Sequence, residues 1–304
     1  MLSILIPTYN YNVYLLAKEL VQQALQENIK FELICIDDGS NAKINIENQK
    51  INTLTNSVFI ANKENIGLSS MRQLLANKAT NNWLLFIDAD MQTLNNNYIK
   101  NYIYYCKKKE APVIYGGITY AELNNSNKNL LRIVYGKKAE CKTVNIRNKS
   151  PFLSILCSNI LLHKEVFKSI QFELKLKQYG YEDALFAYQL KSHNFTVKHI
   201  DNQLLHNDAT PNAVYINKTE QALQNLCFLT NNKLIDYSFV KLSSFYNSVK
   251  PIGLHYIFSF IYFILGENIK HKISKKTPSV FLFNLYKLSY YSYLKLNSNK
   301  KNAS

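Results

Sequence analysis

Two aspartates directly follow an apolar segment in the first third of the chain. Asp88 and Asp90 come after Trp83–Ile87, whose composition predicts a buried strand. Side chains two residues apart in a strand point to the same face, so both carboxylates can reach one cation. Mg²⁺ and Mn²⁺ prefer hard oxygen ligands and often bridge to a diphosphate. The pair therefore predicts a divalent metal site, although a plain solvated strand end would show the same residues.

A second acidic pair follows another apolar segment. Asp37 and Asp38 precede Gly39 and Ser40, which are typical of a tight turn. A carboxylate at this point can accept hydrogen bonds from a base N–H or from ribose hydroxyls, and an ordinary turn is the alternative.

A predicted helix supplies a candidate anion site. Asn65 and Gly67 stand where this helix begins, and helix N-termini favour anions. Arg72 lies farther along the same helix, where it reaches a bound phosphate or is simply a surface arginine.

Two later positions complete the candidate chemistry. Glu182 and Asp183 follow Gly180-Tyr181 and open a predicted helix. A sugar hydroxyl needs a carboxylate within hydrogen-bond reach to act as a nucleophile, whereas acids in a first helical turn are often only caps. His206 becomes a third metal ligand if the fold brings it to the aspartates, and is otherwise structural.

These residues require a sheet whose strands end at one edge. Apolar runs predict strands at 2–6 (ended by Pro7), 31–36, 57–61 and 83–87, with helices at 13–26 and 68–78 between them. Such alternation is typical of an α/β fold with a mostly parallel sheet, and ligands bind such sheets at the carboxyl ends of the strands. Residues 112–162 are strand-like and loop-like, 182–191 helical, 195–200 a strand and 215–247 helical.

The composition sets the class of protein. Apolar residues make up 47% of the chain, which excludes wholesale disorder. The net charge of +15 reflects either attraction to an anionic partner or a lysine-rich composition. Five cysteines without metal-binding spacing, and a Met1 that directly precedes the first strand without a signal-peptide pattern, indicate a cytoplasmic protein.

Taken in order, these motifs resemble those of family 2 glycosyltransferases of the GT-A fold, over residues 2–207. The matching segments are Ser3-Ile4-Leu5-Ile6-Pro7-Thr8-Tyr9-Asn10, Ile36-Asp37-Asp38-Gly39-Ser40, Asn65-Ile66-Gly67 with Arg72-Gln73, Phe86-Ile87-Asp88-Ala89-Asp90 and Tyr179-Gly180-Tyr181-Glu182-Asp183. Gln73 stands where Asn is usual in the family, and Gly180-Tyr181 where many members have Gly-Trp or Gly-Gly.

The resemblance implies a role for each residue. Asp90 binds a Mn or Mg ion directly, Asp88 contacts the ribose or a metal-bound water, and His206 completes the metal shell. Asp183 deprotonates the acceptor hydroxyl while Glu182 orients the acceptor, in one inverting displacement. The resemblance also implies contacts with the nucleotide, which it suggests is UDP, for Pro7, Thr8, Tyr9, Asn10, Asp37, Asp38, Asn65, Gly67, Arg72 and Asp88. It implies contacts with the donor or acceptor sugar for Ser158, Asn159 and Tyr181.

The resemblance also implies a division of the chain. Residues 1–210 form the catalytic domain, with a nucleotide-binding half at 1–110 and an acceptor half at 111–210, and residues 211–304 form a helical, basic, aromatic region. Within that region, residues 252–265 are fourteen uncharged and mostly apolar residues, which is short of the roughly twenty that span a bilayer.

The basic tail predicts a peripheral membrane position. Residues 251–304 hold eight lysines and one glutamate, and lysines interleaved with aromatic residues suit an anionic membrane surface. We expect the inner face of the plasma membrane and a glycan or lipid-linked acceptor, as the resemblance implies. The alternative is a helix pair that packs into the core.

Other functions remain open at this point. A sugar nucleotidyltransferase shares a related fold and metal site, but its chemistry needs no base such as the Glu182-Asp183 pair supplies. A nucleic-acid-binding protein would account for the charge, yet the chain contains no recognisable basic motif, so we expect no nucleic-acid partner. An inactive sugar-nucleotide binder would lack acidic residues that are present here.

Overall fold

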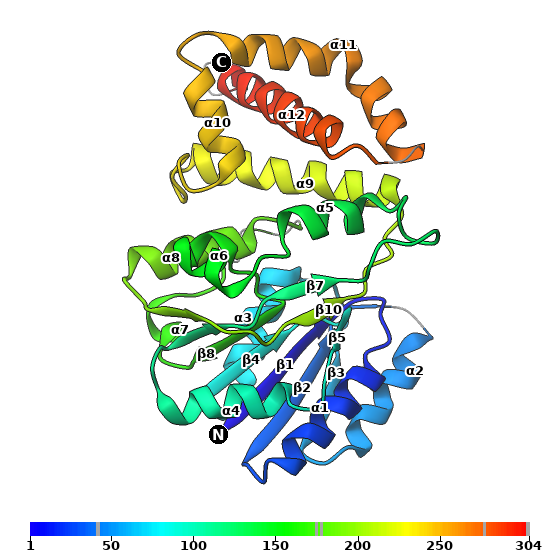
Figure 1. Ribbon diagram of the computed structural model, residues 1–304, viewed down its shortest axis with the longest axis vertical. Helices are drawn as coiled ribbons and strands as arrows, with labels where there is room; N and C mark the ends of the chain where they lie inside the picture. The colour runs from blue at the N-terminus through cyan, green and yellow to red at the C-terminus, as the bar shows by residue number, and fades with distance from the viewer. Residues whose placement is uncertain (41–42, 174–175, 177–178, 276–277, 302–304) are drawn as a thin grey trace. The chain divides into compact units, whose positions relative to one another are not determined.

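A computed structural model describes residues 1–40, 43–173, 176, 179–275 and 278–301 of the chain (Figure 1). Lys276, counted above in the basic tail, lies outside these residues. The chain divides into two compact units, of which the first comprises residues 1–121, 140–177 and 186–207 and the second residues 122–139, 178–185 and 208–304. The domain boundary expected at residue 210 stays a prediction.

A seven-stranded sheet forms the core of the first unit, with the strand order β3-β2-β1-β4-β8-β6-β9. The strands are β1 (Leu2–Thr8), β2 (Phe31–Asp37), β3 (Ser57–Ala61), β4 (Trp83–Ile87), β6 (Val113–Tyr115), β8 (Asn159–His163) and β9 (Val197–His199). β1 to β4 are mutually parallel, and β8 runs antiparallel to both β4 and β6. This arrangement confirms the predicted α/β fold with a mostly parallel sheet.

Helices cover both faces of this sheet (Figure 1). The central strands β1 and β4 are therefore buried along their whole length. α1 (Tyr14–Gln26) packs against α4 (Tyr98–Lys108), and α3 (Leu68–Lys78) packs against β1 and β2. The unit also contains α2 (Ile44–Asn48), η1 (Gln49–Thr53), α6 (Val144–Lys149), η2 (Pro151–Ser154) and α7 (Val166–Ser169). α8 (Glu182–Ser192) begins in residues of the second unit.

The predicted end of the first strand is wrong. β1 does not end at Pro7 but continues through it to Thr8, paired with β2. The N–H of Leu2 and the C=O of Thr8 both form hydrogen bonds on the β2 side of the strand. Backbone groups of successive residues point to opposite sides of a strand, so the nitrogen of Pro7 points toward β4. Pairing with β4 stops at Leu5, so the missing N–H of Pro7 leaves no ladder bond unmade.

A small second sheet of three strands, in the order β5-β10-β7, sits in the first unit. Its strands are β5 (Met91–Thr93), β7 (Ile118–Tyr120) and β10 (Leu204–His206). β10 runs antiparallel to β5, with His206 opposite Met91, and parallel to β7, with His206 opposite Tyr120. This register brings the C-terminal end of the unit back to the segment that follows Asp90.

The second unit is helical. It contains α5 (Leu131–Ala139), α9 (Asn212–Asn231), α10 (Lys241–Val249), α11 (Leu254–Lys275) and α12 (Val280–Lys301), so the helical stretch predicted at 215–247 is two helices. α11 and α12 pack along each other and against α9 around tyrosine-rich clusters. Among the described residues no single helix is long and apolar enough to cross a bilayer, although α10 and α11, bent by 115°, pass together by length and composition.

Candidate active site

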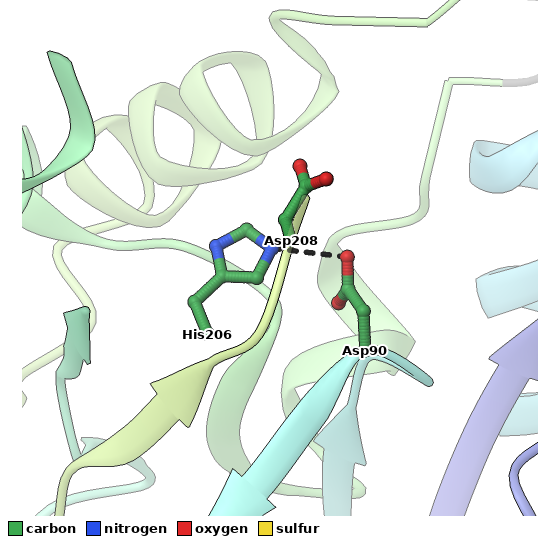
Figure 2. A group of neighbouring side chains, drawn as sticks. All are labelled: Asp90, His206 and Asp208. Carbon is green, nitrogen blue, oxygen red and sulfur yellow. Dashed lines mark hydrogen bonds and ion pairs between the residues drawn. The ribbon is translucent and has the colours of Figure 1, made fainter. Parts of the chain in front are cut away.

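The carboxylate of Asp90 faces the imidazole of His206 (Figure 2). Their Oδ2 and Nε2 atoms are 3.0 Å apart, and the backbone N–H of Asn207 donates to the Asp90 carbonyl. Asp208, only two residues beyond His206 in the chain, offers a third ligand atom, and the three ligand atoms lie within 4.8 Å of one another. Asp208 was not predicted from the sequence, though its spacing from His206 is a signal that could have identified it.

This donor set fits a divalent cation. When the imidazole is neutral with its proton on Nδ1, Nε2 and the Asp90 oxygen present lone pairs to each other at 3.0 Å, and a proton or a metal ion has to lie between them. Ligands about 2.1 Å from a metal at a right angle are about 3 Å apart, which matches the observed separation. Carboxylates with one imidazole suit Mn²⁺ or Mg²⁺. The side chain of His206 is 9% exposed and that of Asp90 is 32% exposed, so solvent reaches this group of side chains from the side of Asp90.

Asp88 has a different partner from Asp90. Its carboxylate accepts from the Arg72 guanidinium, with Nη2 2.9 Å from Oδ1 and 3.3 Å from Oδ2. The Arg72 side chain is only 1% exposed, so it is not a surface arginine. In this structure Arg72 forms an ion pair that orients Asp88, and its predicted phosphate contact stays a prediction. The Asp88 N–H donates to the carbonyl of Ser158, which is itself buried.

The carboxylate of Asp38 occupies the predicted anion site. It accepts from the backbone N–H groups of Ile66 (2.7 Å) and Gly67 (3.0 Å), directly before α3. Burial raises its pKa, partly offset by these two bonds. Gly39 beside it has φ +77° and a virtual Cβ only 2.6 Å from the Glu64 carbonyl carbon, so glycine is required. Asp38 therefore ties the loop after β2 to the residues that precede α3 through Ile66 and Gly67, and the nucleotide contact expected of Asn65 and Gly67 stays a prediction.

Asp37 is also bound within the fold. Its carboxylate accepts from Ser40 N–H (2.8 Å), Ser40 Oγ (2.6 Å) and Asn45 Nδ2 (3.0 Å), and it is almost fully buried. Ser40 Oγ in turn accepts from the N–H of Asn10. The loops after β1 and β2 are therefore tied together at the carboxyl edge of the sheet, as the strand pattern predicted.

The last residue of β1 and the residues that follow it differ in exposure. Thr8 is buried and its hydroxyl donates to the carbonyl of Tyr11, whereas Tyr9 is 55% exposed. Asn10 is exposed and takes a left-handed backbone conformation with φ 52°. Of the predicted nucleotide residues in this loop, Tyr9 and Asn10 are the ones whose side chains are open to a ligand.

The side chain of Asn159 is bound within the fold, and its predicted sugar contact stays a prediction. Its Oδ1 accepts from the hydroxyls of Tyr98 (2.6 Å) and Tyr102 (2.8 Å), and its Nδ2 donates to the carbonyls of Gly117 (2.6 Å) and Asn202 (2.9 Å). The side chain is fully buried. Its four hydrogen-bonding positions are filled in this structure, so it positions β8 and the segment before β7.

The predicted acceptor motif lies in the second unit. Glu182 is buried and its carboxylate accepts from the N–H of Gly180 at 2.8 Å, while Asp183 is half-buried in the first turn of α8. Gly180 has φ +104°, and its virtual Cβ lies 2.3 Å from the Cβ of Ala222. Tyr181 packs against a cluster of α9 and α12, where burial raises its pKa. Tyr181 therefore packs within the second unit, and its predicted sugar contact stays a prediction.

Comparisons with known proteins place this site in a family. The family model described as glycosyl transferase family 2 matches residues 3–171, a range that includes Asp88 and Asp90 but ends before Asp183 and His206. An uncharacterized glycosyltransferase of Haemophilus influenzae is 32% identical over 133 residues, which are 40% of this chain and 42% of that protein. The minor teichoic acid biosynthesis protein GgaB of Bacillus subtilis is 24% identical over 181 residues, 58% of this chain and 19% of its own length. The chain thus spans less than half the length of these curated relatives.

Solved structures share the fold. The mannosyltransferase PcManGT from Pyrobaculum calidifontis, in complex with GDP-Man and Mn²⁺, has a TM-score of 0.56 at 12% identity, over 100% of this chain and 88% of that one. S. aureus TarS has a TM-score of 0.52 at 17% identity, over 97% of this chain and 55% of that one. The family model covers more than half of the sequence, and the chain therefore belongs to glycosyl transferase family 2.

Proposed function

We propose that this protein transfers a sugar from a nucleoside diphosphate donor, a UDP-sugar, to a hydroxyl of a glycan or lipid-linked acceptor. The observation that carries the proposal is the facing pair of Asp90 and His206 at the edge where the parallel strands end. Two TarS structures of TM-score 0.50, in complex with UDP and with UDP-GlcNAc, support the choice of nucleotide.

In this proposal Asp90, His206 and Asp208 hold a divalent ion, Mn²⁺ or Mg²⁺. Once bound, the ion neutralises charge on the departing diphosphate. Asp88 has a separate task because Arg72 already neutralises its carboxylate and fixes its direction. It is left to accept a hydrogen bond from a ribose hydroxyl or an ordered water. Tyr9 and Asn10 offer the open side chains for the base.

The acceptor side of the reaction is assigned to Asp183. The acceptor oxygen forms a bond to the anomeric carbon as the bond from that carbon to the diphosphate oxygen breaks, and the hydroxyl proton passes to the Asp183 carboxylate. One displacement of this kind inverts the anomeric centre. Glu182 is the weaker candidate for the base, because it is buried and bound to the N–H of Gly180.

A screen of nucleotide sugars, with Mn²⁺ or Mg²⁺ present, tests this function. The expected products are a free nucleoside diphosphate and a released or transferred sugar. Release of pyrophosphate would instead identify a nucleotidyltransferase. Steeply salt-dependent binding to nucleic acid without turnover of any nucleotide sugar would identify the nucleic-acid-binding alternative.

The proposal also includes a place of action, the inner face of the plasma membrane. On α11 and the turn before it, apolar side chains are open to solvent instead of packed. They include Ile252 (70% exposed), Tyr256 (62%), Phe260 (64%) and Phe263 (72%). Tyr256, Phe260 and Phe263 recur at helical spacing, so they share one side of the helix. An exposed apolar stripe of this kind suits insertion into a membrane interface.

Positive charge lies beside this stripe. Lys250 precedes α11, and Lys272 and Lys275 stand exposed at its C-terminal end, while Glu267 is the one exposed acid of α11. Each lysine near an anionic membrane surface contributes about 1 kcal/mol of attraction. The combination of exposed aromatic residues and lysines supports an anionic lipid surface as the partner of α11. The opposite side of α11 packs on α9 and α12, so the helix pair is packed on one side and open on the other.

A further inference from the structure

The Tyr120 hydroxyl lies between His206 and Glu140. The oxygen of Tyr120 is 2.9 Å from Nδ1 of His206, and the hydroxyl also bonds to the carboxylate of Glu140. Tyr120 is 3% exposed and comes from β7, directly beside His206 of β10 in the parallel register. All three residues belong to the first unit, and neither Tyr120 nor Glu140 was predicted from the sequence.

The chemistry of these groups fixes the direction of the two hydrogen bonds. A carboxylate only accepts, so the hydroxyl proton of Tyr120 is donated to Glu140. The Tyr120 oxygen then has only lone pairs for the imidazole, so Nδ1 must carry a proton and donate it. This holds whether the ring is neutral or charged. The nitrogen that gives up its proton to become a ligand is therefore Nε2, which faces Asp90.

We infer that Tyr120 and Glu140 are positioning residues that hold His206 in the Nδ1-protonated tautomer, with the Nε2 lone pair directed at the cation beside Asp90. This inference rests on the proposed metal site. Partners of this kind, which receive the second ring N–H of a ligating histidine, fix its orientation and typically change metal affinity by about 10- to 100-fold when removed. Here the carboxylate acts through a tyrosine instead of contacting the histidine directly.

Two substitutions separate positioning from packing. Tyr120→Phe keeps the ring and removes the acceptor for Nδ1–H. Glu140→Ala keeps the tyrosine but frees its proton, which can then be donated to Nδ1 and favour the opposite tautomer. Tyr98→Phe is the matched control, because it also removes a buried hydroxyl that bonds to a side chain, the Oδ1 of Asn159.

The first measurement is nitrogen NMR of histidine-labelled protein without metal, at a pH where His206 is neutral. We expect the Nδ1-protonated form in the wild type and in Tyr98→Phe, and a shift toward the Nε2-protonated form in Glu140→Ala. The second is titration with Mn²⁺ alone, followed by the electron paramagnetic resonance of the free ion. We expect affinity about 10- to 100-fold weaker in Tyr120→Phe and in Glu140→Ala, and unchanged in Tyr98→Phe.

An Nε2-protonated His206 in the wild type, or wild-type Mn²⁺ affinity in both variants, would overturn the inference. Either outcome leaves the proposed function standing if the wild type binds Mn²⁺ and turns over a nucleotide sugar. Failure of the wild type to bind Mn²⁺ at all would reject the metal site itself, and the inference with it.

Discussion

The guanidinium of Arg72 is buried against the carboxylate of Asp88, with Nη2 2.9 Å from Oδ1. The other acid of the same motif, Asp90, faces His206. Two carboxylates that are two residues apart are therefore held by different partners, one by a permanent cation and one by an imidazole. This difference supports the proposal that Asp90 contacts the metal directly and that Asp88 contacts the nucleotide or an ordered water.

Removing Arg72 should destabilise the fold because Asp88 would lose its counter-charge. We expect Arg72→Met to lower the free energy of unfolding by about 2–4 kcal/mol, somewhat reduced because the Asp88 side chain is 27% exposed. The double variant Arg72→Met with Asp88→Asn should recover part of this loss. Urea unfolding of the wild type, Arg72→Met, Asp88→Asn and the double variant gives the coupling energy between the two side chains. Additive effects would show that the ion pair contributes nothing.

Asp183→Asn should nearly abolish transfer, because the amide keeps the size of the side chain and loses its basicity. UDP affinity should stay within a few-fold of wild type. Glu182→Gln is the comparison, and it should retain more transfer since Glu182 is bound to the N–H of Gly180. Turnover near the wild-type rate in Asp183→Asn, with loss in Glu182→Gln, would move the assignment of the base to Glu182.

His199 should make the first unit acid-sensitive. Its Nε2–H donates to the carbonyl of Pro151, and its Nδ1 is buried without a hydrogen-bond partner among the described residues. Burial lowers its pKa to about 4, so between about pH 6.5 and 4 the unfolded chain binds a proton that the folded chain does not. The contribution of neutral His199 to the free energy of unfolding is fully present above about pH 6.5 and is lost as the pH falls through this window.

The loss from this one group between pH 7 and pH 5 should be about 2 kcal/mol. His199→Gln, which keeps an N–H donor and cannot titrate in this range, should show a smaller fall in unfolding free energy over the same interval. His193→Gln, at an exposed position, is the control and should follow the wild type. Identical falls in all three proteins would contradict the role given to His199.

The apolar stripe of α11 should bind anionic vesicles. We expect the protein to float with phosphatidylglycerol-containing liposomes at low salt, and high salt to release only part of it, because salt screens the lysines and leaves the apolar term. Phe260→Ser with Phe263→Ser should abolish the flotation that persists at high salt. Leu15→Ser, which removes an equally exposed apolar side chain from α1, should not. Flotation that is equal in all variants, or absent in the wild type, would reject the membrane proposal.

Long apolar runs explain which elements the sequence predicted. β3, β4 and α3 match their predicted bounds, because each is a segment whose own pattern determines its structure. β5, β7 and β10 have three residues each and no detectable period, so their pairing depends on chain segments more than eighty residues apart. The local sequence around His206 carries no such signal either, so its metal role could be expected only from the family resemblance, and the fold places it beside Asp90.

The candidate site likewise has a part that the sequence predicted and a part that only the fold revealed. The residue types at Asp88 and Asp90 could be read from one motif, whereas the partners of Arg72, Asp38 and Asn159 could not. Each of these three has its polar atoms bound by distant backbone or side-chain groups, so its structural role became visible only with the fold.

The central claim is that sugar transfer depends on a cation held by Asp90 and His206. The direct measurement is the rate of nucleoside diphosphate release from a UDP-sugar as Mn²⁺ is titrated, in the wild type, Asp90→Asn and His206→Gln, with the exposed Asp201→Asn as control. The account predicts saturable activation of the wild type and control, complete loss in EDTA, and a fall of orders of magnitude in the other two. Full activity in excess EDTA, or wild-type Mn²⁺ activation in Asp90→Asn, would contradict it.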